Sequence, residues 1–464
     1  MSSKKYPIKP RTGEPRKRSI QTTVRPAAVT TVPGTIHPIP DEPAAVKKVF
    51  TGRLLVRLDP AATTTEILKK AKTRSLRLLR LQDLPGGSLM AGLEQADGDG
   101  IIFERLKVAL VNANSMAQIK RLQMLRNTPF LSSEPERYLY PAQAAAKKGD
   151  GDLPFKDTAA ATWGIQAINA RKSKYTGKGV KLAILDTGFD FTHPDFTGRV
   201  IHRKSFVGRQ AKDREGHGTH CAGIAGGGRR GRAGVRYGVA ADARLYIGKI
   251  LSDMGEGSDG LALAGIEWAL DQGCQVISMS FGAQVSKGEK YSAIFEDVAR
   301  TALAYNCLLI AATGNESQRE KGRIAPVNHP ANCPSVMAVG ALTEYLKVSD
   351  YSCGGGSAGT GKAKGGQVKS VQLKAGQPGS GHSKGGQVDI AAPGDDILSS
   401  WIDDGYEVES GTSMAAPFVA GVAALLWEQY PDAGAREIWD RLISQAKPLG
   451  LRTPGAGAGM VYVP

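Results

Sequence analysis

Two patterns of apolar and polar positions follow one another along the chain. Between residues 46 and 140, short apolar runs alternate with stretches whose apolar positions recur at helical spacing, three to four residues apart. The order β-α-β-β-α-β is that of a ferredoxin-like split unit, so we expect a small α+β domain here. The expected strands cover residues 52–60, 100–113 (two short strands) and 130–140, and the expected helices cover 64–79 and 115–129.

A longer pattern of strongly apolar strands and helices fills residues 158–464. Strands that are apolar on both faces are typical of a parallel sheet covered by helices on each side. We therefore expect an α/β domain with a mostly parallel sheet flanked by helices. Its clearest strands are 180–188, 243–251, 274–282, 307–315 and 335–342, and its clearest helices are 261–273 and 292–306.

Three segments lack either pattern. Residues 1–45 are rich in Pro, Thr, Lys and Arg and are predicted to be disordered. Residues 141–157 have the composition of a linker. Residues 353–387 are rich in Gly and Lys, and they indicate a surface insert rather than a phosphate-binding loop, since no strand and helix flank them.

Composition narrows the class of protein further. The net charge is +16, but the basic N-terminal segment lacks the run of interleaved aromatic residues that base stacking uses, so a solvated tail is favoured over a nucleic-acid arm. No apolar stretch is long enough for a membrane span, and none follows the basic start as a secretory signal would. Five scattered cysteines do not suggest a disulfide framework. We expect a cytoplasmic protein, with secretion as the alternative.

Three short motifs carry the candidate chemistry. Asp186 lies at the end of an apolar strand, in the motif Asp-Thr-Gly. His217 is the second residue of the motif Gly-His-Gly-Thr-His-Cys-Ala-Gly, which starts at Gly216. Ser413 lies in the motif Gly-Thr-Ser-Met-Ala-Ala-Pro. A serine hydroxyl is a weak nucleophile that needs a histidine base, and the histidine needs a carboxylate to hold its tautomer. Pro417 suits the first turn of a helix, which would place Ser413 at that helix's positive end.

These three motifs together, in the order Asp, His, Ser, resemble those of the subtilisin-like serine proteases, the subtilases. The resemblance implies a subtilisin-like fold and a serine endopeptidase acting through an acyl-enzyme, with no cofactor and no catalytic metal. It assigns Asp186 as the orienting carboxylate, His217 as the base and Ser413 as the nucleophile. His220 becomes a structural histidine; zinc binding by His217 and His220 is the alternative, and it is disfavoured because no glutamate separates them.

The resemblance also implies a substrate site. Asn315 and the backbone N–H of Ser413 would form the oxyanion hole. The expected substrate-binding residues are Ser280, Phe281, Gly282, Gly255, Gly257, Ala312, Gly314 and Glu316. Asn328-His329-Pro330 resembles a segment at the specificity pocket that often holds a cis proline. Three acids, Glu316, Glu256 and Asp259, would favour basic side chains in the substrate, or would simply be solvated surface acids.

By the same resemblance, residues 46–140 would be a propeptide that inhibits and helps to fold the enzyme, with self-cleavage in residues 140–150 and 144–148 as the favoured window. The loop 226–232 lacks the oxygen ligands of the family's calcium site, although Asp195 matches one ligand. Cys221 resembles a free cysteine beneath the catalytic histidine, which predicts sensitivity to mercurials.

Two other functions stay open at this stage. A subtilase fold can transfer the acyl group to an amine, as a peptide ligase or macrocyclase does. A regulatory protein that binds partners through its basic arm is the third hypothesis, and the complete triad argues against it. The expected partners are protein or peptide substrates and the chain's own N-terminal domain; the sequence does not determine the oligomeric state.

Overall fold

The computed structural model describes residues 47–84, 89, 98–144, 153–228, 234–355, 385–450 and 455–463. The expectations for residues 1–45, for most of 353–387 and for the middle of 141–157 therefore lie outside the described residues. None of the helices in the described part combines the length and apolarity that crossing a membrane requires.

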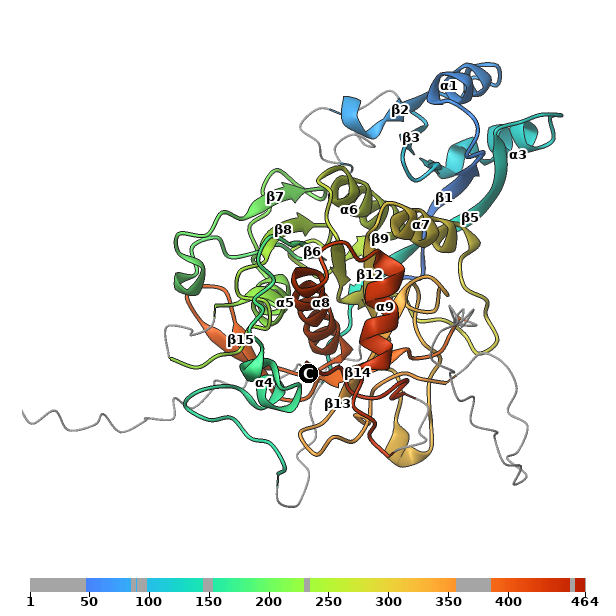
Figure 1. Cartoon of the computed structure of the whole chain (residues 1–464). Helices are drawn as coiled ribbons and strands as arrows, with labels where there is room; N and C mark the ends of the chain where they lie inside the picture. Colours follow the sequence, from blue (N-terminus) through green and yellow to red (C-terminus); the bar gives the residue numbers. More distant parts are fainter. Residues whose placement is uncertain are drawn as a thin grey trace, which may run out of the picture. The chain divides into compact units, whose positions relative to one another are not determined.

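The N-terminal α+β region forms a sheet with strand order β5-β1-β4-β3-β2 (Figure 1). The first four of these strands pair antiparallel, and their order is that of a split β-α-β unit. One face of the sheet packs on two helices around a small core that includes Val56, Ile67 and Ile119. The elements are β1 (Phe50–Leu58), α1 (Thr64–Lys72), β2 (Leu78–Arg80), β3 (Gly100–Phe103), β4 (Val108–Val111), α3 (Met116–Gln123) and β5 (Phe130–Pro141).

Two expectations for this region need correction. The helix expected over 115–129 is shorter and covers Met116–Gln123. The helix expected over 64–79 ends at Lys72, and Leu78–Arg80 instead form β2, which pairs parallel with β3. Ser75 has a φ of 55°, a left-handed backbone conformation that cannot continue a right-handed helix. The start of α1 fits its sequence closely, since Thr63 and Glu66 form a reciprocal capping box.

The large domain is built on a seven-stranded parallel sheet of order β14-β13-β12-β10-β6-β8-β7. The sheet is buried on both faces, as the apolar strands predict. In β6, Leu182 and Ile184 join the core on one face, while Ala183 and Leu185 join the core on the other. The strands are β6 (Lys181–Asp186), β7 (His202–Ser205), β8 (Arg244–Lys249), β10 (Val276–Met279), β12 (Leu308–Ala312), β13 (Met337–Leu342) and β14 (Ile390–Pro393).

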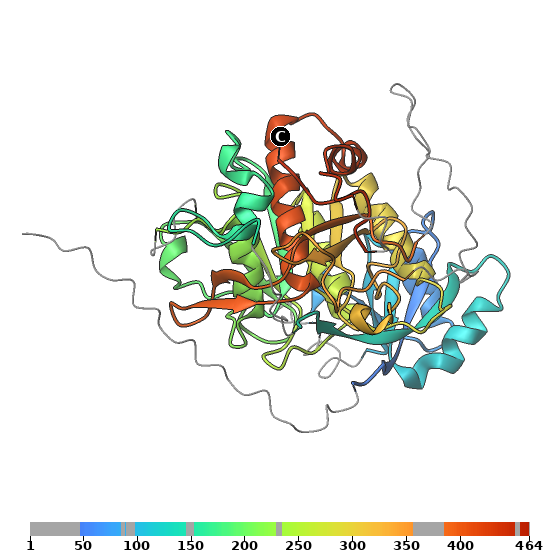
Figure 2. The same cartoon turned by 90° about the horizontal axis from the view of Figure 1, so that it is seen from below.

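Helices cover both faces of this sheet, which Figure 2 shows from below. One core contains residues of α5, α8 and α9, and the opposite core contains residues of α6 and α7. A two-stranded hairpin lies beside α5. The remaining elements are α4 (Trp163–Ala167), α5 (His217–Gly226), β9 (Gly257–Ser258), α6 (Asp259–Asp271), β11 (Phe281–Gly282), α7 (Ala293–Ala304), β15 (Ile397–Ser400), β16 (Tyr406–Glu409), α8 (Thr412–Gln429) and α9 (Ala435–Ser444).

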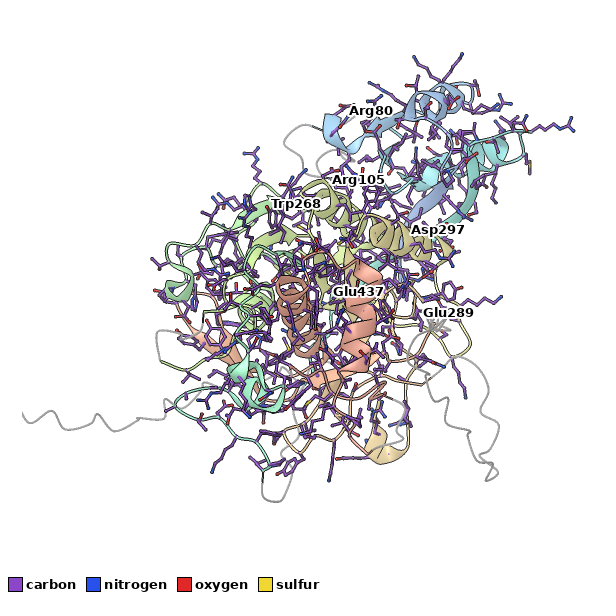
Figure 3. The ribbon with its side chains drawn as sticks, in the orientation of Figure 1. Arg80, Arg105, Trp268, Glu289, Asp297 and Glu437 are labelled. Atoms are coloured by element: carbon purple, nitrogen blue, oxygen red, sulfur yellow. The ribbon has the colours of Figure 1, made fainter. Side chains whose placement is uncertain are left out.

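The N-terminal sheet packs against α6 and α7 of the large domain. Leu55 and Leu110 belong to the same apolar core as these helices, and residues 48–464 form one compact unit. Polar contacts line the boundary, where Figure 3 labels Arg105, Glu289 and Asp297. The ion pairs are Arg57–Asp297, Arg105–Asp271 and Arg137–Glu289.

Carboxylates of β5 also cap the two helices that it crosses. Glu134 accepts hydrogen bonds from the Ser292 hydroxyl and the N–H of Ala293 at the start of α7. Glu136 accepts one from the N–H of Gly260 in the first turn of α6. A negative charge at a helix N-terminus is favourable because it meets unpaired N–H groups and the positive end of the helix dipole. The last strand of the N-terminal region is therefore held in a fixed direction.

Candidate active site

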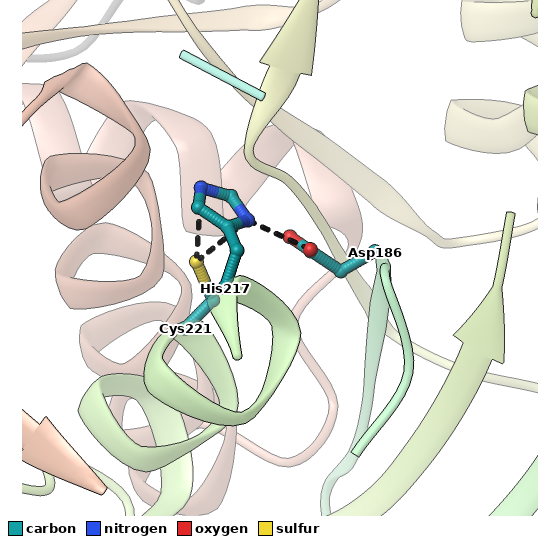
Figure 4. Close-up of side chains that lie close together, drawn as sticks. All are labelled: Asp186, His217 and Cys221. Carbon is teal, nitrogen blue, oxygen red and sulfur yellow. Dashed lines mark hydrogen bonds and ion pairs between the residues drawn. The ribbon is translucent and has the colours of Figure 1, made fainter. Parts of the chain in front are cut away.

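Asp186 and His217 meet at the carboxyl ends of the parallel strands. Asp186 is the last residue of β6 and His217 the first of α5, and both side chains are fully buried. His217 Nδ1 lies 2.7 Å from Asp186 Oδ1 (Figure 4). The N–H of Thr187 donates to the same oxygen, so the carboxylate has a fixed orientation. A carboxylate bonded to Nδ1 leaves Nε2 free to accept a proton.

The Asp186 carboxylate stabilises the cation that His217 becomes when it accepts a proton. Burial alone would lower the pKa of His217, but the adjacent Asp186 carboxylate outweighs it, and the pKa lies well above the ordinary value. Cys221, one turn along α5, places its Sγ 3.9 Å from His217 Nδ1. Burial raises the pKa of this thiol. The imidazole is thus packed between a carboxylate and a protonated thiol.

Ser413 is the second residue of α8, and Pro417 explains an unusual feature of that helix. Pro417 lies inside the helix rather than in its first turn as expected. It has no N–H, so the carbonyl of Ser413 lacks its usual partner four residues on. The Ser280 hydroxyl donates to that carbonyl at 2.8 Å, and the Cys221 thiol donates at 3.5 Å. The proline therefore ties Ser413 to the elements that carry Ser280 and His217.

The hydroxyl of Ser413 is held by two backbone groups. Oγ donates to the carbonyl of Ser280 at 2.8 Å and accepts from the N–H of Ala142 at 2.9 Å. Ser413 and His217 both belong to the described part of the chain, and no hydrogen bond joins Ser413 Oγ to His217 there. A rotation about χ1 of Ser413 is needed before His217 Nε2 can take the hydroxyl proton.

The carbonyl oxygen of Ala142 lies against the backbone of Ser413, near the amide of Asn315. The Ser413 N–H donates to this oxygen at 3.2 Å. Asn315 turns its Oδ1 toward Thr412, accepting from both the N–H and the hydroxyl at 3.0 and 2.9 Å. Its Nδ2 is therefore directed away from Thr412, and it is buried without a partner among the described residues. A preorganised, unpaired donor is what stabilisation of a developing oxyanion requires.

The chain's own residues 138–144 occupy the cleft. Tyr138 and Leu139 pair antiparallel with β9, while Tyr140 and Pro141 pair antiparallel with β11. The peptide is thus the middle strand of three, the arrangement of a peptide added to exposed strand edges. Leu139 is fully buried. Beyond Ala142, the N–H of Ala144 donates to the carbonyl of Ser410 at 2.7 Å.

A backbone approach at Gly411 makes room for this peptide. Gly411 has a φ of 152°, and a Cβ there would lie 2.3 Å from the carbonyl oxygen of Ala142. Any side chain would displace the peptide from Ser413. The glycine of the Gly-Thr-Ser motif is therefore needed for access to the nucleophile.

The model of the subtilase family matches residues 177–460. The chain belongs to the subtilase family. It is 36% identical over 292 residues to a subtilisin of Bacillus sp. (strain TA39), covering 58% of this chain and 62% of that protein. It is 32% identical to subtilisin DY of Bacillus licheniformis, covering 62% of this chain and 92% of that protein. The matched region thus spans less than two thirds of the first relative's length.

Two further comparisons agree with the subtilase assignment. The chain is 32% identical to an intracellular serine protease of Paenibacillus polymyxa, covering 65% of this chain and 84% of that protein. The solved structure of sphericase matches with a TM-score of 0.54 and 31% identity, covering 65% of this chain and 98% of that one. This confirms the expected subtilisin-like α/β fold and places the chain in a family of serine endopeptidases, which are hydrolases.

The other expected site residues of this subtilase lie around the seated peptide. Ser280 borders Ala142, and Phe281 and Gly282 form β11. Gly257 belongs to β9, and Gly255 faces the ring of Pro141. Three further residues lie near the oxyanion donors: Ala312 ends β12, Gly314 donates its N–H to the Thr412 hydroxyl, and Glu316 follows Asn315.

The three acids expected to favour basic substrates differ in their surroundings. Asp259 is fully buried, where its carboxylate contacts His329 Nε2 at 2.8 Å and accepts from the N–H of Arg137. It therefore does not line an open subsite. Glu316 Oε2 already accepts from the amide of Asn328 at 3.0 Å and from the thiol of Cys353. Glu256 alone among the three is exposed without such partners.

His220 has a structural environment in this subtilase. Its Nε2 donates to the backbone carbonyls of Ile397 and Glu407 at 2.9 and 3.1 Å. Burial, and next the charge of His217, lower its pKa to about 3. A neutral histidine whose Nε2 is committed to carbonyls does not form a zinc pair with His217. The one compact group of potential metal ligands in the described residues is Asp186, His217 and Cys221. It consists of the Asp186–His217 pair and the cysteine that packs against it.

Asp195, which matches a calcium ligand of the family, contacts two tyrosines in this structure. Asp195 Oδ2 accepts hydrogen bonds from the hydroxyls of Tyr237 and Tyr406. Calcium prefers several carboxylate and carbonyl oxygens, so a carboxylate bonded to two tyrosines does not fit that role. Part of the loop expected to lack calcium ligands, residues 229–232, lies outside the described residues. All five cysteines are buried and free.

Sequence reasoning missed two acids beside the catalytic histidine. Glu215 accepts the N–H of His217 at 2.7 Å, and Glu409 ends β16. Burial raises the pKa of both carboxyls, to about 7 for Glu409, and both interact with the charge of His217. Glu215 and Glu409 are 194 positions apart, so no local motif joins them. The one sequence signal for their role was that each lies a few residues before a motif, Glu215 before His217 and Glu409 before Ser413.

Proposed function

We propose that this subtilase is an active serine endopeptidase made as a zymogen, and that its first substrate is its own Ala142–Gln143 bond. One observation carries the proposal: the Ala142 carbonyl oxygen accepts the Ser413 N–H at 3.2 Å, beside the unpartnered amide of Asn315. This bond lies inside the expected range 140–150 and just before the favoured window 144–148.

The chemistry follows from the positions of the side chains. Ser413 Oγ turns from the Ser280 carbonyl toward His217 Nε2, gives up its proton and attacks the carbonyl carbon of Ala142. Asp186 stabilises the resulting imidazolium. The Ser413 N–H and Asn315 Nδ2 stabilise the negative oxygen. His217 then returns the proton to the nitrogen of Gln143, leaving Ala142 esterified to Ser413, and water hydrolyses the ester.

The same contacts support inhibition after cleavage. Residues 138–141 keep their strand pairing with β9 and β11, Leu139 stays buried, and three ion pairs hold the N-terminal sheet on the helices. None of these contacts depends on the Ala142–Gln143 bond. We therefore propose that residues 46–142 stay bound as an intramolecular inhibitor until they are released or degraded.

The seated residues also define a test substrate, Leu-Tyr-Pro-Ala followed by a chromogenic amine. We expect the processed protein to hydrolyse it and a Ser413→Ala variant to be inactive. Equal activity in both preparations would mean that a contaminating protease hydrolyses the substrate. With a peptide amine as acceptor, a product lighter by one water than the sum of the two peptides would instead indicate ligation.

We also propose that the protein acts in the cytoplasm. All five thiols are free in the structure, and one relative is described as an intracellular serine protease. Fractionation of cells that express the natural gene tests this. Accumulation of the processed protein outside the cell would contradict it.

A further inference from the structure

The chain seats residues on both sides of the Ala142–Gln143 bond, so the leaving-group side of the cleft can be examined directly. Ala144 pairs antiparallel with Ser410 as an isolated bridge. The Cα of Gln143 lies 3.1 Å from the position of a Cβ on Gly411. Gln143 is therefore opposite Gly411, and a substrate strand that continues this ladder by one further step would bring its third residue after the scissile bond opposite Glu409.

This register decides which substrate side chains meet Glu409. Directly opposed residues in an antiparallel pair point to the same face, and successive residues alternate. The Ser410 side chain points into the body of the domain, where its hydroxyl accepts the N–H of Asp396. Glu409 points to the other face. The first and third positions after the scissile bond share that face, and the second does not.

The carboxylates of Glu215 and Glu409 are compensated only in part, through the charge of His217. In the described residues Glu215 forms no ion pair and accepts one hydrogen bond, from the His217 N–H. The Glu409 carboxylate has neither an ion pair nor a hydrogen bond in this part of the chain. Burial raises the pKa of Glu409, and the charges of Glu407 and Glu215 raise it further, while the charge of His217 lowers it. A cation from the substrate would relieve this repulsion.

We propose that Glu409 makes this subtilase prefer lysine or arginine at the first and third positions after the scissile bond. The preference rests on the proposed peptidase function and concerns the same cleft. It differs from the basic preference expected from the sequence, which placed the acids on the other side of the bond. There, Asp259 is buried against His329 and Glu316 is bonded to Asn328.

The test measures kcat/KM at pH 8, above the pKa of about 7 of Glu409, on internally quenched peptides that contain Leu-Tyr-Pro-Ala. Lysine, glutamine or glutamate is placed at the first, second or third position after alanine. We expect lysine to exceed glutamate by about tenfold at the first and third positions, the size of a partly screened charge pair. At the second position the ratio should stay near one.

Two variants complete the design. Glu409→Gln should lower the lysine-to-glutamate ratio several-fold at the first and third positions. Glu437→Gln is the matched control, because it removes one negative charge from the exposed face of α9, where Glu437 pairs with Arg441, and it should leave every ratio unchanged.

The outcomes separate the two proposals. Cleavage of the peptides with no lysine preference, with the strongest preference at the second position, or with a preference unchanged in Glu409→Gln overturns this inference alone. Failure of the processed protein to cleave any peptide overturns the proposed function, and the inference with it.

Discussion

Asn315 gives the sharpest test of the oxyanion geometry. In the proposed mechanism the Ser413 N–H and the unpartnered Asn315 Nδ2 both stabilise the oxyanion formed from the Ala142 carbonyl, so replacing Asn315 removes one of two donors. Removing one such donor from a subtilisin costs about 2.7–4 kcal/mol, or roughly 10²–10³ in kcat. Asn315→Ala also loses the two hydrogen bonds that Oδ1 accepts from Thr412, each contributing about 1 kcal/mol to stability.

Asn315→Asp separates the two effects. Aspartate keeps an oxygen for both Thr412 bonds but replaces the Nδ2 donor with a negative oxygen. We expect both variants to lose at least about 100-fold in kcat on the Leu-Tyr-Pro-Ala substrate with little change in KM, and only Asn315→Ala to lose thermal stability. Steady-state kinetics and calorimetry measure the two quantities. A kcat reduced less than tenfold in Asn315→Asp, or a loss confined to KM, would refute the assigned role.

Three further predictions concern the N-terminal region and the thiol. Leu139→Ala removes a fully buried side chain from the strand that pairs with β9 and β11. Inhibition by the cleaved N-terminal region should weaken at least about 30-fold, because about 2 kcal/mol or more of binding free energy is lost. Unchanged inhibition would contradict the position of this strand. Burial under that region raises the pKa of Glu267 to about 7 from its ordinary 4.5. Glu267 therefore holds its proton more tightly when the N-terminal region is bound. Raising the pH from 5 to 8 should weaken the binding of that region by up to roughly 50-fold, and Glu267→Gln should abolish this effect. Binding that tightens as the pH rises would contradict this prediction. A mercurial should inactivate the wild type but spare Cys221→Ala, because Sγ lies 3.9 Å from His217 Nδ1; equal inactivation would place the reactive thiol elsewhere.

The sequence predicts the large domain well, because its pattern is encoded locally, and it also brings the candidate catalytic residues to notice through local motifs. Strands apolar on both faces indicate a covered parallel sheet, and each triad residue lies in its own short motif. The structure brings Asp186 and His217 within 2.7 Å at the carboxyl end of the sheet. The oxyanion donor Asn315 is recognisable in the same way, from its position just after a strand.

Features that depend on long-range contacts could not be predicted. The run that contains Leu78 and Leu79 suits a helix or a short strand equally, and pairing with β3 decides in favour of the strand. Asp259 resembles a surface acid in the sequence, but the approach of Arg137 and His329 buries it. The alignment of Ala142 with Ser413 depends on where β5 meets β9 and β11, a register that no local pattern contains.

Intact mass of freshly purified wild-type protein, measured beside Ser413→Ala, tests the central claim most directly. The account predicts that the wild type separates into two fragments, one ending at Ala142 and the other beginning at Gln143, while the variant keeps its full mass. Cleavage of both proteins at the same bond would show that another protease performs the processing. A wild type that stays whole while it hydrolyses Leu-Tyr-Pro-Ala substrates would contradict self-processing at this bond.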